Sequence, residues 1–376
     1  MSGGAAMTRR VSDAGGATTA GSAPSPQRRS ADHPDRRLAW AELLRLPALF
    51  TVPGDALAGA AATAAAPNPR TLLAIGSSLC LYEAGMALND WADREEDAAE
   101  RPHRPLPSGR IHPAAALSAA CALTGAGLAL AARAGRPALA VAAPLAATIW
   151  AYDLALKHTP AGPVAMATAR GLDLLLGAAT TTGRTREALG PAALLGTHTL
   201  AVTAVSRQET RGGTPLTPLA ALAATGLLTR LVGRRPAVAT WRRSTVRAAR
   251  MPAAAVGARE AAPGLPGAPA TRHASGHASG AGPRSRPTYD PAPQPPAAAL
   301  GVALAAAYAA TAVRPYFHAT LNPSPPLTQR AVTGGIRATI PLQAALTARS
   351  GAGATALLVA ALAPLGRRFG RQVSLT

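Results

Sequence analysis

Aromatic and acidic residues are scarce in this sequence. Phe, Trp and Tyr make up only 3% of its 376 residues, and 18 Asp and Glu stand against 38 Lys and Arg, which gives a formal net charge of +20. A chain this basic can bind nucleic acid, but its arginines lie at the ends of apolar runs and in polar tails, without interleaved aromatic residues. Membrane topology and anionic lipid headgroups produce that distribution. We therefore predict that nucleic acid is not a partner.

Cysteine is almost absent as well. Cys80 and Cys121 lie in separate apolar runs with no neighbouring His or Cys, so neither a disulfide framework nor a zinc site is predicted. Residues 1–37 contain no apolar stretch, and no cleavable signal peptide is expected. They are rich in Arg, Ser, Gly and Pro, which predicts a disordered, basic cytoplasmic tail over 1–37.

Apolar residues, in contrast, make up 48% of the chain and are grouped into long runs. A helix needs about 20 such residues to cross the hydrocarbon layer of a bilayer. A soluble helical bundle would show polar residues at helical spacing along each run, and these runs mostly lack them. The sequence therefore predicts an all-α, polytopic membrane bundle of nine or ten transmembrane helices. The runs are 38–62, 71–90, 113–133, 136–156, 161–181, 190–206, 215–233, 296–313, 331–348 and 352–366.

The runs fall into two blocks, residues 38–233 and residues 296–376. Between them, residues 234–295 are low in complexity and rich in Pro and Arg, which predicts a linker that is too polar to build a core. The lipid bilayer is thus a predicted partner, and the protein is expected to be integral to a membrane, which we take to be the plasma membrane.

Basic residues bias short loops toward the cytoplasm, so the Arg-rich N-terminus is predicted to lie inside. Counting spans from there places three polar segments on the cytoplasmic face, namely residues 90–112, 152–159 and 206–213. A site built from these segments would face the cytoplasm.

The first of these segments, NDWADREEDAAERPHRPLPSGR at residues 89–110, holds many of the chain's few acids. Asn89, Asp93 and Asp97 are spaced i, i+4, i+8 and would share one face if the preceding helix continues. Carboxylates this close repel one another unless a cation lies between them. Mg²⁺ is the natural candidate, because it takes oxygen ligands and is usually held by carboxylates together with substrate phosphates. The alternative is a solvated helix end whose acids and arginines pair with one another.

The arginines that follow in the same segment suit phosphate oxygens, since the planar guanidinium can bind them with two parallel hydrogen bonds. Prolines 102, 105 and 107 stiffen this stretch. Acids and arginines together predict a site for a metal-bound diphosphate.

Two motifs carry a resemblance to a known family. The pattern NDxxDxxxD followed by RPxRPLxSG resembles the first signature of the UbiA superfamily of intramembrane prenyltransferases, and Tyr152, Lys157 and Thr159 are similar to that family's YxxxKRxT segment. The resemblance implies an all-helical membrane bundle that transfers a polyprenyl group from its diphosphate to an acceptor with Mg²⁺ on two Asp-rich motifs. The substrates that it implies are a polyprenyl diphosphate and a small-molecule acceptor, which we expect to be an aromatic or other ring compound.

The family's second Asp-rich motif is degenerate here, and this makes the chain a divergent member. It should fall at SRQETRGG, where Arg207 and Arg211 stand at the positions expected for aspartates and only Glu209 is acidic. Either Glu209 helps to hold a second Mg²⁺ while the arginines act directly on the diphosphate, or the second metal is absent and activity is reduced or lost.

By this resemblance each motif residue receives an expected role. The expected catalytic residues are Asp93, Asp97, Arg104 and Lys157. The expected substrate-binding residues are Asn89, Arg101, Tyr152, Arg207, Glu209 and Arg211. The expected metal ligands are Asn89, Asp90, Asp93, Asp97 and Glu209.

The sequence is also compatible with other functions. They are a non-catalytic isoprenoid-binding or export component that retains the pocket, and transfer of a phosphoribosyl group to polyprenyl phosphate. Two further groups lie within apolar runs, where an ionisable residue is costly. For Asp173 an ion pair with Arg170 at i, i+3 competes with a catalytic role, and His198 is a candidate for lining an acceptor pocket.

Overall fold

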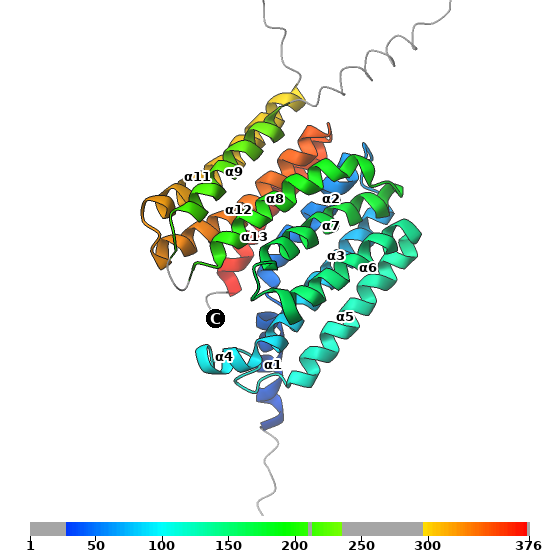
Figure 1. Ribbon diagram of the computed structural model, residues 1–376. Helices are drawn as coiled ribbons and strands as arrows, with labels where there is room; N and C mark the ends of the chain where they lie inside the picture. The colour runs from blue at the N-terminus through cyan, green and yellow to red at the C-terminus, as the bar shows by residue number, and fades with distance from the viewer. Residues whose placement is uncertain (1–27, 210–212, 235–295, 374–376) are drawn as a thin grey trace, which may run out of the picture.

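The structure is a computed structural model that describes residues 28–209, 213–234 and 296–373. Within these ranges the regular elements are all helical, as the sequence predicts. Figure 1 shows the long helices side by side in one bundle, with α1 and α4 at its lower end. The linker predicted at 234–295 lies outside the described residues except for Arg234, and so does the predicted tail up to residue 27.

The bundle contains the following elements. The helices of the first block are α1 (Arg28–Leu43), α2 (Val52–Ala62), α3 (Pro69–Ala92), α4 (Arg94–Glu100), α5 (Pro113–Ala134), α6 (Arg136–Ala151), α7 (Gly162–Thr182), α8 (Leu189–Ser206) and α9 (Leu216–Gly233). The second block holds α11 (Pro296–Leu321), α12 (Pro325–Arg349) and α13 (Gly353–Val373). Short turns of helix are η1 (Leu46–Thr51), η2 (Tyr152–Leu156) and η3 (Arg186–Ala188).

The first predicted span, residues 38–62, is wrong as a continuous helix. It is divided into the end of α1, the 3₁₀ turn η1 and α2. Arg45 has a left-handed backbone, with φ 47° and ψ 45°, and Pro47 follows two residues later. Pro47 has no N–H to donate to the Leu43 carbonyl, and its ring would clash with that carbonyl in a continued helix, so α1 ends at Leu43 and the chain turns before α2. In addition, α1 begins at Arg28, inside the stretch predicted as a tail.

Six of the described helices are long and apolar enough to cross a membrane. They are Pro69–Ala92, Pro113–Ala134, Arg136–Leu156, Arg186–Ser206, Leu216–Gly233 and Ala298–Leu321. The count of nine or ten spans is therefore not confirmed. In the most apolar window of α3, 56% of the residues are buried, against 22% for α5 and for α6 with η2. Thus α3, which carries the Asp-rich motif at its end, is an inner helix, while α5 and α6 present most of their surface outward.

Small residues let α2 and α7 approach each other closely. A Cβ placed on Gly59 would lie 2.0 Å from the carbonyl oxygen of Leu174, and a Cβ on Gly177 would lie 2.4 Å from that of Ala56. Membrane helices commonly associate through such glycine contacts. This contact fixes α7, and therefore the residues that α7 contributes to the site, against the first block of the bundle.

Candidate active site

The Asp-rich segment lies where α3 passes into α4. Asp93 is the single residue between α3 and α4. Its backbone N–H donates to the Asn89 carbonyl (2.9 Å), and its own carbonyl accepts from the N–H of Asp97 (2.8 Å). These two bonds keep the helical i, i+4 spacing across the junction of α3 and α4. Asn89, Asp93 and Asp97 therefore follow one another at intervals of one turn, as the sequence predicts.

Arginines neutralise two of the acids in this segment. Asp97 is buried and pairs with Arg104 (2.7 Å) and Arg101 (3.6 Å). Asp90 is also buried and pairs with Arg45 (3.2 Å) and Arg104 (3.5 Å). Arg104 therefore joins both carboxylates and ties the proline-rich loop to the end of α3.

Asp93 is the acid of this segment that meets the second motif. It forms an ion pair with Lys157, and the His158 ring nitrogen Nε2 lies 3.8 Å from its Oδ1. The Lys157 side chain is 10% exposed and that of Asp93 is 20% exposed. Lys157 follows η2, a π-helical turn at the end of α6, and irregular turns of this kind are frequent at functional sites. The two segments that resemble the family motifs thus converge on one ion pair.

Arg207 stands beside the loop that carries Lys157. Its Nη1 donates to the carbonyls of Thr159 and Lys157 (3.3 Å to the latter), and its Nη2 donates to the carbonyl of His158 (3.4 Å). Gly162 leaves room for the Arg207 guanidinium beside this loop, because a Cβ on residue 162 would lie 3.0 Å from the Lys157 carbonyl oxygen and 3.2 Å from the Arg207 Nη1. The arginine at the position of an expected aspartate is therefore engaged with backbone oxygens in this structure.

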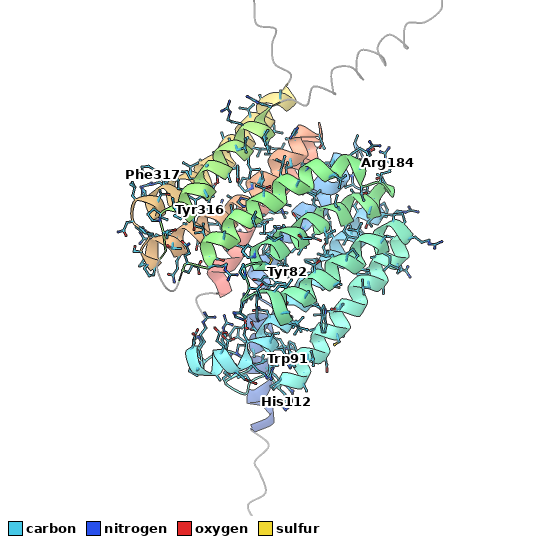
Figure 2. All side chains as sticks on the ribbon, in the orientation of Figure 1. Tyr82, Trp91, His112, Arg184, Tyr316 and Phe317 are labelled. Atoms are coloured by element: carbon cyan, nitrogen blue, oxygen red, sulfur yellow. The ribbon has the colours of Figure 1, made fainter. Side chains whose placement is uncertain are left out.

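A cavity of about 280 Å³ lies between α3, α6 and α7 and reaches the Asp-rich segment at Asn89. Its mouth is polar, since the Asn89 amide donates to the Asp153 carboxylate (3.2 Å) and Tyr152 stands next to it. Its walls are mainly apolar, and Tyr82 lies inside the bundle, between the end that carries Trp91 and the end that carries Arg184 (Figure 2). The apolar wall residues are Leu81, Met86, Leu145, Ile149, Met166 and Ala169.

The inner end of the cavity is polar. Ser78, Arg170 and Asp173 line it, and the Ser78 hydroxyl donates to the Asp173 carboxylate. Arg170 forms its ion pair with Asp55 of α2 (Nε to Oδ2, 2.9 Å), so the ion pair expected at i, i+3 with Asp173 is replaced by one between helices. Gln343 of α12 completes the network by donating to Asp55 (2.7 Å). A deep apolar cavity thus has charged groups at both ends.

The residues around Asp93 offer one place for a divalent cation. Ligand atoms of Asp93, Glu96 and His158 lie within 4.8 Å of one another, and all three side chains reach solvent. Carboxylate oxygens at a partly exposed position suit Mg²⁺, which keeps several of its waters and takes phosphate oxygens as further ligands. The residues present fit one such ion. Asp90 and Asp97, which were expected to be ligands, already face arginines.

Comparisons with known proteins identify the family of this region. Residues 49–233 match the UbiA prenyltransferase family, and this range includes the Asp-rich segment, Lys157, Arg207 and the whole cavity lining except Arg45. The chain carries a UbiA prenyltransferase domain. The predicted resemblance is thereby confirmed.

Two curated relatives share part of the sequence with this UbiA domain protein. One, from Methanothrix thermoacetophila, is named digeranylgeranylglyceryl phosphate synthase and is 39% identical over 107 residues, which are 28% of this chain and 40% of the relative. Another of the same name, from Methanopyrus kandleri, is 35% identical over 147 residues, 38% of this chain and 52% of the relative. The chain thus spans about half the length of the relatives it matches.

The fold of the UbiA protein is also found among solved structures. One, described as giving structural and mechanistic insights into the biosynthesis of digeranylgeranylglyceryl phosphate synthase in membranes, superposes with a TM-score of 0.51 at 16% identity, over 84% of this chain and 98% of that chain. At this level of identity the similarity shows a shared fold.

The remaining predicted residues lie at the edge of the site or outside it. Glu209 follows α8 and has no ion-pair partner among the described residues, and partial burial raises the pKa of its carboxyl above the usual value. Arg211 lies outside the described residues. His198 is buried between α8, α11 and α12, where its ring bonds Tyr308 and the Gly335 carbonyl (both 3.1 Å), and it does not line the cavity.

Local sequence patterns did not identify Glu96 and His158 of the candidate metal site, and they also missed Arg45 and Asp153. Arg45 lines the cavity and pairs with Asp90, and the Leu46-Pro47 step after it signals the turn that places it there. Asp153 is buried beside Asn89. It precedes Lys157 by one turn, and a carboxylate at the end of an apolar helix is the signal that could have identified it.

Proposed function

We propose that this UbiA domain catalyses Mg²⁺-dependent transfer of a polyprenyl group from its diphosphate to an acceptor bound in the membrane-embedded cavity. The observation that carries the proposal is the Asp93–Lys157 pair, one helical turn beyond Asn89 and Asp153, which line one end of an apolar cavity whose other end is lined by polar residues. The isoprenoid chain would lie along the apolar walls, and its diphosphate would lie at the charged end.

The charged residues would bind the leaving group. Asp93, with Glu96 and His158, would hold one Mg²⁺, and the bound ion would stabilise the negative charge on the departing diphosphate. Lys157 would exchange its contact with Asp93 for a phosphate oxygen. Arg101, the more exposed partner of Asp97, has donors left for a second phosphate. Arg104 stays with Asp90 and Asp97 and keeps the loop in place.

In the transfer itself the bond between the allylic carbon and the diphosphate oxygen breaks, and a bond from that carbon to the nucleophilic atom of the acceptor forms. The acceptor loses one proton, and the diphosphate leaves with the bonding electron pair. Apolar walls that exclude water protect the allylic carbon from hydrolysis during this exchange.

The polar inner end of the cavity would orient the acceptor. Arg170 and Asp173 offer a donor and an acceptor of hydrogen bonds, and Ser78 offers a hydroxyl. Because two relatives are named as synthases of a glyceryl phosphate lipid, an acceptor with a glyceryl phosphate group is the first class to test. An aromatic or other ring acceptor, as expected from the sequence, is the second.

Basic residues of the chain would compensate for the aspartates that the second motif lacks. Arg207 binds three backbone carbonyls of the loop after η2, so we assign it to positioning Lys157. One Mg²⁺ would then suffice, because Lys157 and Arg101 would neutralise further phosphate charge. Arg45 and Arg104 would stay paired with the other acids of the segment. The proposed site would face the cytoplasm, together with the basic loops.

A second candidate is an isoprenoid-binding protein without catalysis, which the missing acids at positions 207 and 211 favour. The test is incubation of the purified protein with geranylgeranyl diphosphate, Mg²⁺ and either acceptor class, while diphosphate release and prenylated product are measured. Product from the wild type, and none from Asp93→Asn, supports transfer. Mg²⁺-dependent binding of the diphosphate without product for any acceptor supports the binding protein instead.

A further inference from the structure

A second charged cavity lies far along the chain from the proposed active site. It is a groove of about 700 Å³ between α11 and α12, at the left edge of the bundle in Figure 1. Thr311 and Pro315 contribute from α11, and Gln329, Arg330, Thr333 and Arg337 contribute from α12. None of these residues lines the cavity beside Asp93.

The floor of the groove is closed by a contact between the helices. A Cβ placed on Gly334 would lie 2.8 Å from Cγ of Pro315 and 3.4 Å from the carbonyl oxygen of Thr311. The helix backbones therefore approach as closely as a glycine allows, and the groove opens outward from this contact. Arg330 and Arg337, one turn before and one turn after Gly334, stand above it on the same face of α12.

No acidic side chain of the described residues pairs with either arginine. Both side chains are exposed, and in the described part of the chain neither forms an ion pair or a hydrogen bond. The sequence explains why, because residues 291–376 contain seven arginines and no Asp or Glu. The preceding acids, Glu260 and Asp290, are the two acids of residues 235–295. Among the described residues, therefore, no acidic side chain neutralises this groove.

The surroundings indicate an amphiphilic anion. Arg337 lies twelve residues into α12, roughly 18 Å from its start at 1.5 Å per residue. The same two helices expose apolar side chains, with Ile336 53% exposed next to Arg337 on α12 and Phe317 48% exposed two residues after Pro315 on α11, and Figure 2 shows Phe317 at the outer edge of α11. An arginine on such a surface is costly within a bilayer unless a headgroup reaches it. Guanidinium groups bind phosphate oxygens in a bidentate manner.

We propose that the α11–α12 groove is a binding site for an anionic phospholipid, whose headgroup phosphate is held by Arg330 and Arg337 and whose acyl chains lie along Ile336 and Phe317. Gln329, Thr311 and Thr333 provide hydrogen-bonding groups for the rest of the headgroup. The site is independent of the proposed prenyl transfer, since it shares no residue with that cavity.

The experiment compares lipids and variants with purified, detergent-solubilised protein. Retention of phosphatidylglycerol and of phosphatidylcholine is titrated by native mass spectrometry and by thermal stabilisation, because a ligand that binds the folded protein raises its midpoint. The test variant is R330Q/R337Q. The control is R367Q/R368Q on α13, which removes the same number of charges from the same acid-free part of the chain.

We expect wild type and control to bind phosphatidylglycerol more tightly than phosphatidylcholine. In R330Q/R337Q the affinity for phosphatidylglycerol should fall about thirtyfold, since each arginine near an anionic lipid contributes roughly a fivefold change. A variant with wild-type affinity would overturn the proposal. If inorganic phosphate competes fully at millimolar concentration, the groove binds free phosphate and the lipid assignment is wrong.

A thermal midpoint measured without lipid tests whether R330Q/R337Q is folded. R330Q/R337Q should have the wild-type midpoint in detergent without lipid, since both side chains are exposed. If the midpoint of R330Q/R337Q is lower than that of the wild type, R330K/R337K is used as the test variant instead. That variant keeps the charge but loses the bidentate geometry, and its affinity for phosphatidylglycerol should fall several-fold, whereas an unchanged value would again overturn the proposal.

Discussion

Arg207 is expected to act on the substrate through Lys157. Its guanidinium donates to three carbonyls in the loop at residues 157–159. A hydrogen bond contributes about 0.5–1.5 kcal/mol net, and the exposed position of Arg207 favours the lower end. Loss of all three therefore releases the loop by about 1.5–2 kcal/mol, and we expect Arg207→Ala to weaken prenyl diphosphate binding about 10- to 30-fold.

A double-mutant cycle with Lys157→Met distinguishes this positioning role from direct contact with the diphosphate. If Arg207 works by orienting Lys157, its removal should cost little once Lys157 is gone, and the coupling energy should approach the full effect of Arg207→Ala. If Arg207 binds the diphosphate itself, the two losses should add.

The assay is titration of the detergent-solubilised variants with geranylgeranyl diphosphate and Mg²⁺, with Arg133→Ala as a control for loss of one exposed positive charge. Additive losses, within about 0.5 kcal/mol, would refute the positioning role. Arg207→Asp would restore the acid that the family pattern expects, but it would place a carboxylate among carbonyl oxygens. We expect it to bind less diphosphate than Arg207→Ala.

Four further predictions concern the packing and the site. Gly59→Ala should lower the thermal midpoint by several degrees, because overpacking costs about 1–3 kcal/mol, whereas Gly125→Ala, with open space around it, should not. Asp93→Asn should abolish Mg²⁺-dependent diphosphate binding while Glu95→Gln, an 87% exposed neighbour, retains it; equal binding in both would remove the metal assignment. Mg²⁺ activation should follow a Hill coefficient near one, and a value near two would show a second essential ion. Deletion of residues 236–292 should leave the folded protein and its diphosphate binding intact, as size-exclusion chromatography and the same titration would test.

Most of the helices could be predicted from the sequence because long apolar runs with few charges indicate helices that can cross a membrane, whether or not they are buried in the protein. The ends of the helices were harder to predict. The run predicted at 296–313 continues as α11 to Leu321 and the run at 331–348 begins as α12 at Pro325, because Arg314, His318 and Arg330 are polar but compatible with a helix. The break after Arg45 was missed because composition averages over a turn that one backbone conformation creates.

The site was predictable only in part, for a different reason. The spacing of Asn89, Asp93 and Asp97 along one helix could be read locally, and the family resemblance added Lys157. The contacts that shape the cavity join distant positions, such as Gln343 and Asp55, which are 288 residues apart. No local pattern reports such a contact, so the polar network around Arg170 appeared only in the structure.

We propose that the Asp93–Lys157 site transfers a prenyl group. The most direct measurement is formation of prenylated product from radiolabelled geranylgeranyl diphosphate by the full chain in lipid nanodiscs, with Mg²⁺ and with a glyceryl phosphate lipid or a ring acceptor. We expect product from the wild type and from Glu95→Gln, and none from Asp93→Asn or Lys157→Met. Equal product from all four proteins, or bound diphosphate with no product from any acceptor, would contradict it.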